Sequence, residues 1–179
     1  NTNKLWLIMQ TKYFKIVPIE QKHIENIARL QKIAFSNKES VEQLSVGLKH
    51  LYIDNPFTGK HPTSVVALNN NKVIGFRGLV GLPFCFNHKI FNVLIPSSAN
   101  THPDFRRQGL FSLMNHAAFE MLNDNYRLFL NTSSNTLSTP GYLKLGWQVL
   151  GEKDYLYKPT LLKKTSRKKG YEVIFHDNI

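Results

Sequence analysis

An apolar stripe at helical spacing, set between two extended segments, constrains the fold more than any other feature of the sequence. The stripe consists of Leu110, Leu113, Met114, Ala117, Ala118, Met121 and Leu122, and it predicts a helix with one buried face. Residues 90–101 before the stripe and residues 127–131 after it have the patterning of strands. A strand, a helix and a second strand in this order predict a parallel crossover, with the helix on one face of the sheet.

The remaining patterning adds elements of both kinds to this crossover. In chain order we expect a strand over 13–19, helices over 24–35 and 41–52, strands over 64–68 and 73–80, a short helix before 147, and strands over 147–157 and 171–175. Ser36 and Glu39 have the spacing of a capping box between the two helices. Pro96 predicts a bulge or bend in the strand that contains it. The order as a whole predicts an α/β fold with a central mixed sheet flanked by helices.

Length and cysteine content favour one domain in a reducing compartment. The 179 residues suit a single domain over 13–179, with residues 1–12 as an N-terminal extension. Cys85 is the one cysteine, which excludes an intramolecular disulfide, and its neighbours Phe84 and Phe86 suggest a buried structural thiol. No apolar run approaches the roughly 20 residues of a membrane helix. We therefore expect a cytoplasmic protein without membrane contact.

The charge balance favours an anionic partner. Twenty-three Lys and Arg against twelve Asp and Glu give a net charge of +11. Six of these cations lie in a connector over 158–170: Lys158, Lys163, Lys164, Arg167, Lys168 and Lys169. A solvated basic connector is favoured over a nucleic-acid-binding segment, because the chain has no helix-turn-helix, zinc or RNA-binding signature. The histidines and the lone cysteine have no metal-ligand spacing, so no metal is expected.

The segment over 103–112 carries the strongest local signal. It joins a strand to the apolar-striped helix, and it places Arg106 and Arg107 where a helix begins, although the helix dipole favours acidic residues there. The two arginines make sense if an anion binds in the loop, with Gly109 allowing close approach to the backbone amides. A basic surface turn with an incidental glycine is the alternative.

This segment resembles the acyl-CoA-binding motif of the GCN5-related N-acetyltransferase (GNAT) family. The family pattern is Arg or Gln, two residues, Gly, one residue, then Gly or Ala; Arg106 and Gly109 fill the first two positions and Phe111 departs from the third. A second segment is similar to the part of the family that follows its fifth strand. There Asn135, Tyr142, Gly146 and Trp147 keep the family's spacing.

The resemblance implies an acetyl-CoA site in a gap between two splayed parallel strands, here 97–101 and 127–131. In the family the pantetheine arm pairs with strand backbone and the pyrophosphate with loop amides. The corresponding cofactor-binding residues are Ala99, Asn100, Thr101, Arg106, Arg107, Gln108, Gly109, Leu110, Phe111 and Asn135. Tyr142 takes the family role of the acid that protonates the departing thiolate.

The family often has a glutamate as general base on the central strand, and here Ser97 occupies that place. No carboxylate occurs between Phe91 and Thr101. A water held by Ser97, Ser98 or Asn100 that relays the proton to a base elsewhere is the alternative, and it would make lysine a candidate acceptor. Other candidate bases are His102, His116, Glu152 and Asp154. The absent carboxylate favours an acceptor with a low amine pKa, such as an amino sugar or an amino acid.

The expected function is therefore transfer of an acetyl group from acetyl-CoA to a primary amine of a small molecule by direct attack. A CoA-binding sensor without catalysis and a nucleic-acid-binding module are the alternatives. A homodimer is left open.

Overall fold

The structure, a computed structural model, describes residues 9–10, 13–36, 38–58, 61–122, 128–132, 134, 136 and 138–151. The chain divides into two compact units, residues 1–149 and residues 150–179. Only two residues of the second unit are described, and every described helix and strand belongs to the first.

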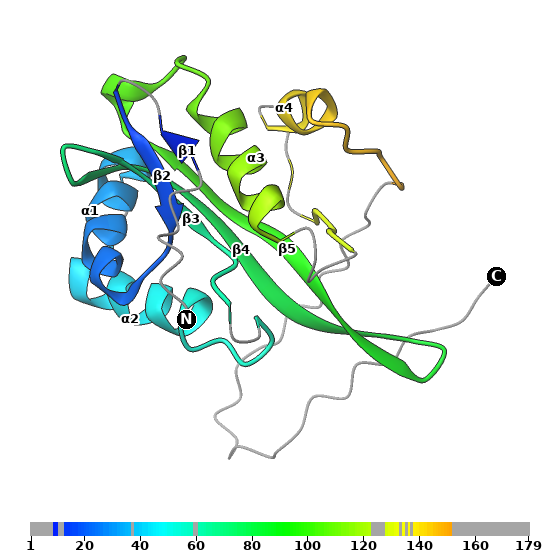
Figure 1. Ribbon diagram of the computed structural model, residues 1–179. Helices are drawn as coiled ribbons and strands as arrows, with labels where there is room; N and C mark the ends of the chain where they lie inside the picture. Colours follow the sequence, from blue (N-terminus) through cyan, green and yellow to red (C-terminus); the bar gives the residue numbers. More distant parts are fainter. Residues whose placement is uncertain are drawn as a thin grey trace, which may run out of the picture. The chain divides into compact units, whose positions relative to one another are not determined.

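A five-stranded antiparallel sheet forms the centre of this unit (Figure 1). Its strands lie in chain order: β1 (Met9–Gln10), β2 (Lys15–Pro18), β3 (Val65–Asn69), β4 (Lys72–Phe86) and β5 (Lys89–Thr101). The last two hairpins turn through residue pairs with positive φ, Asn70–Asn71 and Asn87–His88. Asn and His tolerate this conformation better than most residues do, which is why both turns could be predicted from the sequence. The short strand β1 lies within the segment expected to be an extension.

Alternation along the strands sends neighbouring side chains to opposite faces of the sheet. Val66 and Leu68 of β3 pack with α1 (Ile24–Phe35) and α2 (Val41–Tyr52) on one face. Val65 and Ala67 pack with α3 (Leu110–Leu122) on the other face. All three helices have the bounds that their apolar spacing predicts to within a residue, since each buries one stripe against the sheet.

The capping box proposed at Ser36 is wrong. Ser36 ends α1 in the left-handed conformation, with φ 51°. Ser40, which is extended, accepts the Gln43 N–H and so caps α2 in a reciprocal box. An N-cap residue must be extended so that its side chain can reach the first turn, and a residue in the left-handed region cannot fill that role.

The predicted parallel crossover is confirmed. After α3, the Leu94 N–H donates to Leu128 O (3.2 Å) and the Leu130 N–H donates to Leu94 O (3.1 Å), which pairs β5 in parallel with the segment around Phe129. The five strands themselves are antiparallel, and among the described residues the strand expected over 127–131 is reduced to this isolated parallel bridge at Phe129. Residues 147–151 form no strand, and the rest of the strands expected over 147–157 and 171–175 lies outside the described residues, as does the basic connector.

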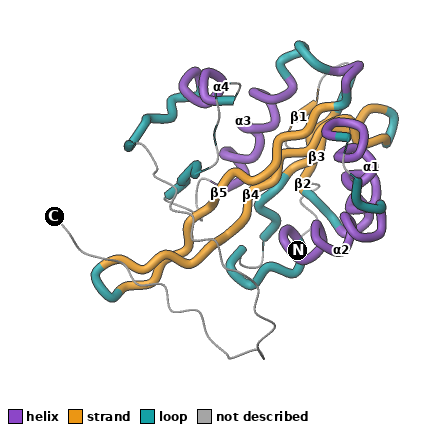
Figure 2. The backbone as a smooth tube through the Cα atoms, turned by 180° about the vertical axis from the view of Figure 1, so that it is seen from behind, coloured by secondary structure: helices purple, strands orange, loops and turns teal. Residues whose placement is uncertain are grey.

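Strands β4 and β5 continue past the helices as a two-stranded arm (Figure 2). β4 ends at Phe86, beyond the end expected at residue 80. Cys85 lies on this arm and is exposed, so the expectation of a buried thiol is wrong. Its aromatic neighbours suggested burial, but most residues of the arm are exposed and no described helix covers it.

Candidate active site

The bulge predicted at Pro96 is confirmed and lies where the parallel pairing stops. Gly78 pairs with Ser98 and Leu79 pairs with Pro96, which leaves Ser97 as the extra residue. Pro96 has no N–H with which to continue the parallel hydrogen bonding from Leu94. Among the described residues, no strand pairs with the edge of β5 beyond this point. The bulge thus leaves an open strand edge over residues 97–101.

The predicted pantetheine-binding residues differ in their access to this edge. The His102 N–H donates to Ile74 O of β4, so by alternation Asn100 also faces β4, and Asn100 is fully buried. The backbone groups of Ala99 and Thr101 point toward the open edge. Ala99 is exposed and Thr101 is partly buried. An extended ligand could form strand-like hydrogen bonds with Ala99 and with the Thr101 N–H, whereas Thr101 O already accepts from Arg106 Nε (3.4 Å).

A pocket of about 350 Å³ opens at the end of β5, where the chain turns into α3. Its wall is Thr101, Phe105, Arg106, Arg107, Gly109, Leu110 and Phe111. Arg107 (φ 61°) and Gly109 (φ 73°) are both in the left-handed region. Such a conformation is unfavourable for an arginine, and strain of this kind clusters at ligand sites.

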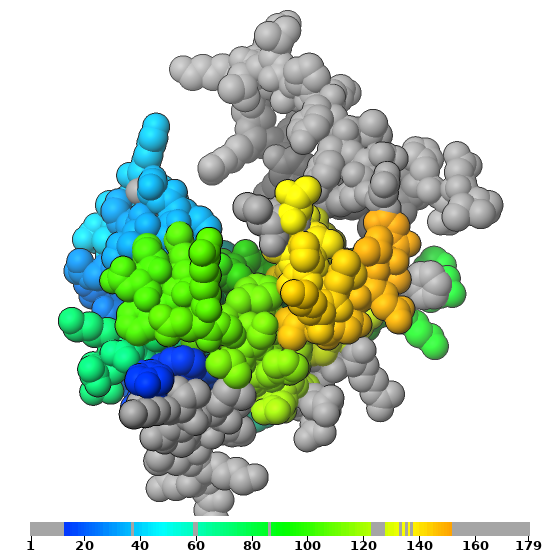
Figure 3. Space-filling view, turned by 90° about the horizontal axis from the view of Figure 1, so that it is seen from above, coloured from blue at the N-terminus to red at the C-terminus, as the bar shows by residue number. Residues whose placement is uncertain are grey.

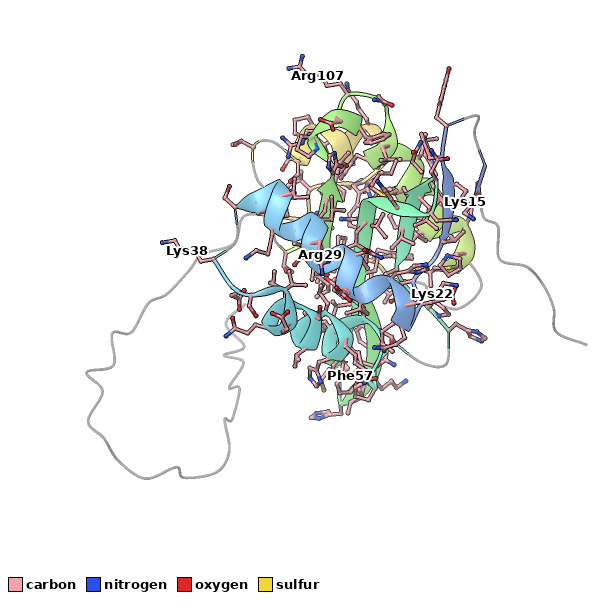
Figure 4. All side chains as sticks on the ribbon, turned by 90° about the vertical axis from the view of Figure 1, so that its left-hand side faces the viewer. Lys15, Lys22, Arg29, Lys38, Phe57 and Arg107 are labelled. Carbon is pink, nitrogen blue, oxygen red and sulfur yellow. The ribbon has the colours of Figure 1, made fainter. Side chains whose placement is uncertain are left out.

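The electrostatics of this loop suit an anion. The Leu113 N–H donates to Gly109 O (3.1 Å), so α3 begins at a residue that has no side chain with which to cap the first amides. The first turn of α3 contains no acidic residue. Arg106 is exposed, and the exposed Arg107 side chain projects away from the body of the fold (Figure 4). Backbone amides, a helix dipole and two cations together can bind a diphosphate.

Tyr142 lies on α4 (Thr139–Lys144) and is 7% exposed. Its ring contacts two aromatic rings edge-on, with centroids 5.6 Å away at Phe111 and 5.1 Å away at Trp147. Gly146 (φ 84°) turns the chain so that the Trp147 N–H donates to Tyr142 O (3.2 Å). The glycine–tryptophan pair found in the sequence therefore holds the tyrosine in place.

Phe111, which departs from the family pattern, packs directly against α4. A Cβ atom at Gly141 would lie 3.0 Å from Phe111 Cε1, so the absence of a side chain at Gly141 makes room for the ring. Figure 3 shows the start of α3 (green) beside the described residues of 138–151 (yellow to orange). The two sequence motifs, about thirty residues apart, thus meet at one place.

Sequence analysis missed Arg77, which is 1% exposed in β4. Arg77 Nη2 donates to Tyr142 Oη (2.7 Å) and Nη1 donates to Ser98 O (3.2 Å). Burial lowers the pKa of the guanidinium, and the neighbouring Tyr142 partly opposes this effect. A single cation inside an otherwise apolar strand was the signal that could have revealed it.

Three hydroxyl groups meet at the bulge, on the α2 side of the sheet. Tyr52 Oη lies 2.8 Å from Ser97 Oγ and donates to Ser98 Oγ (3.0 Å). Gly78 leaves the space for Tyr52, because a Cβ there would lie 2.6 Å from the phenol oxygen. No carboxylate of the described residues is hydrogen-bonded to these hydroxyls.

The other predicted site residues lie elsewhere. His102 Nδ1 accepts the Asp104 N–H (3.4 Å) within the loop, and His116 is exposed on α3. Neither is hydrogen-bonded to Ser97 or Tyr142. Asn135, Glu152 and Asp154 lie outside the described residues. The described part of the chain has no cluster of metal-ligating side chains and no helix long and apolar enough to cross a membrane.

A parallel strand pair that stops at a β-bulge, followed by a loop at a helix N-terminus with electrostatics that suit an anion, is the arrangement implied by the resemblance to the acyl-CoA N-acyltransferases. The family model for the acetyltransferase (GNAT) domain matches residues 15–150. The chain belongs to this family and is an acetyl-CoA-dependent N-acetyltransferase, which confirms the resemblance and the fold expected from the sequence.

Solved structures agree on the fold. Aminoglycoside N-acetyltransferase AAC(6')-Iy in complex with CoA is 18% identical, with a TM-score of 0.64 over 83% of this chain and 97% of that one. A possible acetyltransferase from Clostridium difficile is 17% identical, with a TM-score of 0.62 over 83% and 99% of the two chains. A predicted acetyltransferase with acetyl-CoA from Clostridium acetobutylicum is 18% identical, with a TM-score of 0.58 over 80% and 96%. No curated protein sequence matches significantly.

Proposed function

We propose that the protein acetylates a primary amine of a small molecule, and that the amine nitrogen attacks the thioester of acetyl-CoA directly. The observation that carries this proposal is the hydroxyl cluster of Tyr52, Ser97 and Ser98 at the bulge, to which no carboxylate of the described part of the chain is hydrogen-bonded. Hydroxyl groups can orient a water or an amine, but they are poor proton acceptors at neutral pH. The acceptor must therefore arrive largely deprotonated.

Amine pKa values then separate the candidate substrates. A lysine side chain of pKa about 10.4 is neutral in about one molecule in 2,500 at pH 7. An α-amino group of pKa about 7.8 is neutral in about one in seven. Amino sugars and similar metabolites of low amine pKa are favoured for this reason, and the structural similarity to an enzyme named for aminoglycosides is consistent with them.

The geometry supports the roles that we propose for the remaining residues. The loop over 106–110 binds the pyrophosphate through its amides, and Ala99 and Thr101 pair with the pantetheine arm. Tyr142 donates its proton to the departing sulfur. A thiolate is a moderate leaving group on its own, so this proton contributes less than a typical general acid does.

The test is acetyl transfer itself. Purified protein is incubated with acetyl-CoA and a panel of amino sugars, amino acids and lysine peptides, and acetylated products are measured by mass spectrometry. We expect acetylation of one of the small amines at pH 7. Acetylation of lysine peptides alone would contradict the proposed acceptor class.

A further inference from the structure

We infer that Arg77 is a positioning residue for Tyr142, and that its buried guanidinium aims the phenol proton at the CoA sulfur. The inference rests on the proposed role of Tyr142 and goes beyond it, because it assigns a function to a residue that no motif contains. The buried charge of Arg77 is an energetically unfavourable feature of the fold. Arg77 is 1% exposed and no carboxylate among the described residues forms an ion pair with it.

A buried and uncompensated cation is unfavourable, so a fold without use for it would more readily hold an apolar residue there. Its partners here are weak ones for a charge. They are the Tyr142 hydroxyl at 2.7 Å, the Ser98 carbonyl at 3.2 Å and the faces of the Phe111 and Tyr142 rings at 5.9 and 5.4 Å. Arg77 Nε has no hydrogen-bond partner in the described structure.

The direction of the hydrogen bond determines what Tyr142 can do. A guanidinium only donates, so Tyr142 Oη must accept from Arg77, and the phenol proton must point to a third group. The Phe111 and Trp147 rings fix the position of the tyrosine ring. Arg77 also donates to Ser98 O, beside the bulge. One side chain therefore connects the proposed acid to the strand that would hold the thioester.

Besides positioning Tyr142, Arg77 assists the reaction through its charge. The amine nitrogen forms a bond to the acetyl carbon, the carbon–sulfur bond breaks, and its electron pair goes to sulfur. Tyr142 gives its proton to this sulfur, which leaves as the thiol, and the resulting phenolate faces the guanidinium. The surplus proton of the acetylated amine passes to solvent, and Tyr142 regains a proton from solvent. A preorganised cation stabilises this transient phenolate, which a neutral side chain could not do.

The experiment is a double-mutant cycle with Arg77→Met, Tyr142→Phe and the double variant, measured as kcat and as the KM for acetyl-CoA. If Arg77 acts through Tyr142, Arg77→Met lowers kcat about 10- to 100-fold with little change in KM, and it changes kcat less than about threefold once Tyr142 is Phe. Arg77→Lys keeps the charge but not both hydrogen bonds, so its loss should be intermediate. Arg29→Met, which removes an exposed arginine of α1 (Figure 4), is the matched control and should keep full kcat.

Each of the following results would overturn the inference. Arg77→Met could lower kcat equally in both backgrounds, or not at all. If Arg77→Met does not fold, a wild-type kcat in Arg77→Lys would contradict the inference. Full kcat in Tyr142→Phe alone would remove the proposed acid and this inference together, whereas an impaired Tyr142→Phe with additive Arg77 effects would remove only the inference.

Discussion

The Phe111 ring lies edge-on to the Tyr142 ring, with centroids 5.6 Å apart and an interplanar angle of 82°. Phe111 also lines the pocket at the start of α3, so one side chain contacts both the anion-binding loop and the proposed acid. A Gly or Ala at this position, as in the family pattern, would have no ring to offer Tyr142. The departure from the pattern is therefore matched by Gly141, whose missing side chain admits the ring.

Gly109→Glu should abolish acetyl-CoA binding while the protein still folds. A side chain at Gly109 would meet no atom within 4 Å, so it would enter the space of the ligand and place a negative charge there. Acetyl-CoA at about a hundred times its Kd should raise the free energy of unfolding by about 2.7 kcal/mol. For a protein of this size, this corresponds to a rise in Tm of roughly 5 to 10 °C. We expect that rise in the wild type and none in the variant.

The matched control is Gly47→Glu on the exposed face of α2, which also has open space around it. Gly47→Glu should keep the full acetyl-CoA shift. Gly109→Glu will lower the Tm without ligand by a few degrees, because φ 73° costs a non-glycine residue about 1 to 2 kcal/mol. An undiminished shift in Gly109→Glu would place the cofactor elsewhere.

Tyr142→Phe should lower kcat more than it weakens acetyl-CoA binding. The variant keeps the ring contacts with Phe111 and Trp147 and removes only the hydroxyl. General acids contribute about 10²- to 10⁴-fold, and a thiolate leaving group argues for the lower end. Steady-state kcat and the acetyl-CoA melting shift separate the two effects. An unchanged kcat, with chemistry shown to be rate-limiting, would exclude Tyr142 as the acid.

Gly78→Ala should destabilise the fold around the bulge. The added Cβ would lie 2.6 Å from Tyr52 Oη, and the Tyr52 ring is held edge-on by Phe76 at 5.0 Å, so it has little freedom to move. Overpacking of this kind costs about 1 to 3 kcal/mol. Gly47→Ala, in the open on a helix, should instead stabilise by up to about 1 kcal/mol. Urea unfolding of the two variants measures the difference, and equal stabilities would contradict the packing described at Tyr52.

The stability of the fold should decrease as His23 becomes protonated. His23 is 6% exposed, and its Nδ1 accepts the Glu20 N–H (3.0 Å) at the start of α1. Burial lowers its pKa below the ordinary 6.5, with smaller effects from Lys22 and Lys15 in the same direction and from Glu20 in the opposite one. The folded state thus favours neutral imidazole. The stabilisation is complete above pH 6.5 and is lost as the pH falls from 6.5 through the lower folded-state pKa.

His23→Gln keeps a hydrogen-bond acceptor but does not titrate. Between about pH 7.5 and about pH 5.5, the Tm of the wild type should fall further than that of His23→Gln. Parallel pH dependences of the two proteins would show that His23 is not the group responsible.

Much of this architecture was readable from the sequence because it depends on local patterns. The apolar period of α3, the paired asparagines at Asn70–Asn71 and the proline before the bulge each determine their own backbone. The position of the loop before α3 could also be predicted, since Arg106 and Gly109 lie within four residues of each other, and anion binding there stays a prediction. In each case the residues that determine the local structure lie within the segment that adopts it.

The parts that could not be read depend on contacts between distant segments. Arg77 and Tyr142 are 65 residues apart, and Tyr52 and Ser97 are 45 apart. The sequence spacing of neither pair predicts a contact, because only the sheet register and the helix packing bring these residues together. For Cys85 the local pattern predicted burial that does not occur, since its apolar neighbours lie on an arm that no described helix covers.

The pH dependence of turnover should follow the acceptor, because the hydroxyl cluster at the bulge offers no strong proton acceptor. Across acceptors of graded amine pKa, turnover should rise with pH until each amine is neutral, and the midpoint should follow the pKa of the acceptor. Ser97→Ala should lower turnover only modestly, because Ser97 positions a water or the amine rather than accepting its proton. A common midpoint for all acceptors would indicate an enzyme base instead. If lysine peptides prove the best substrates at pH 7, the inference from the absent carboxylate is wrong, and a relay from Ser97 to a base elsewhere in the chain takes its place.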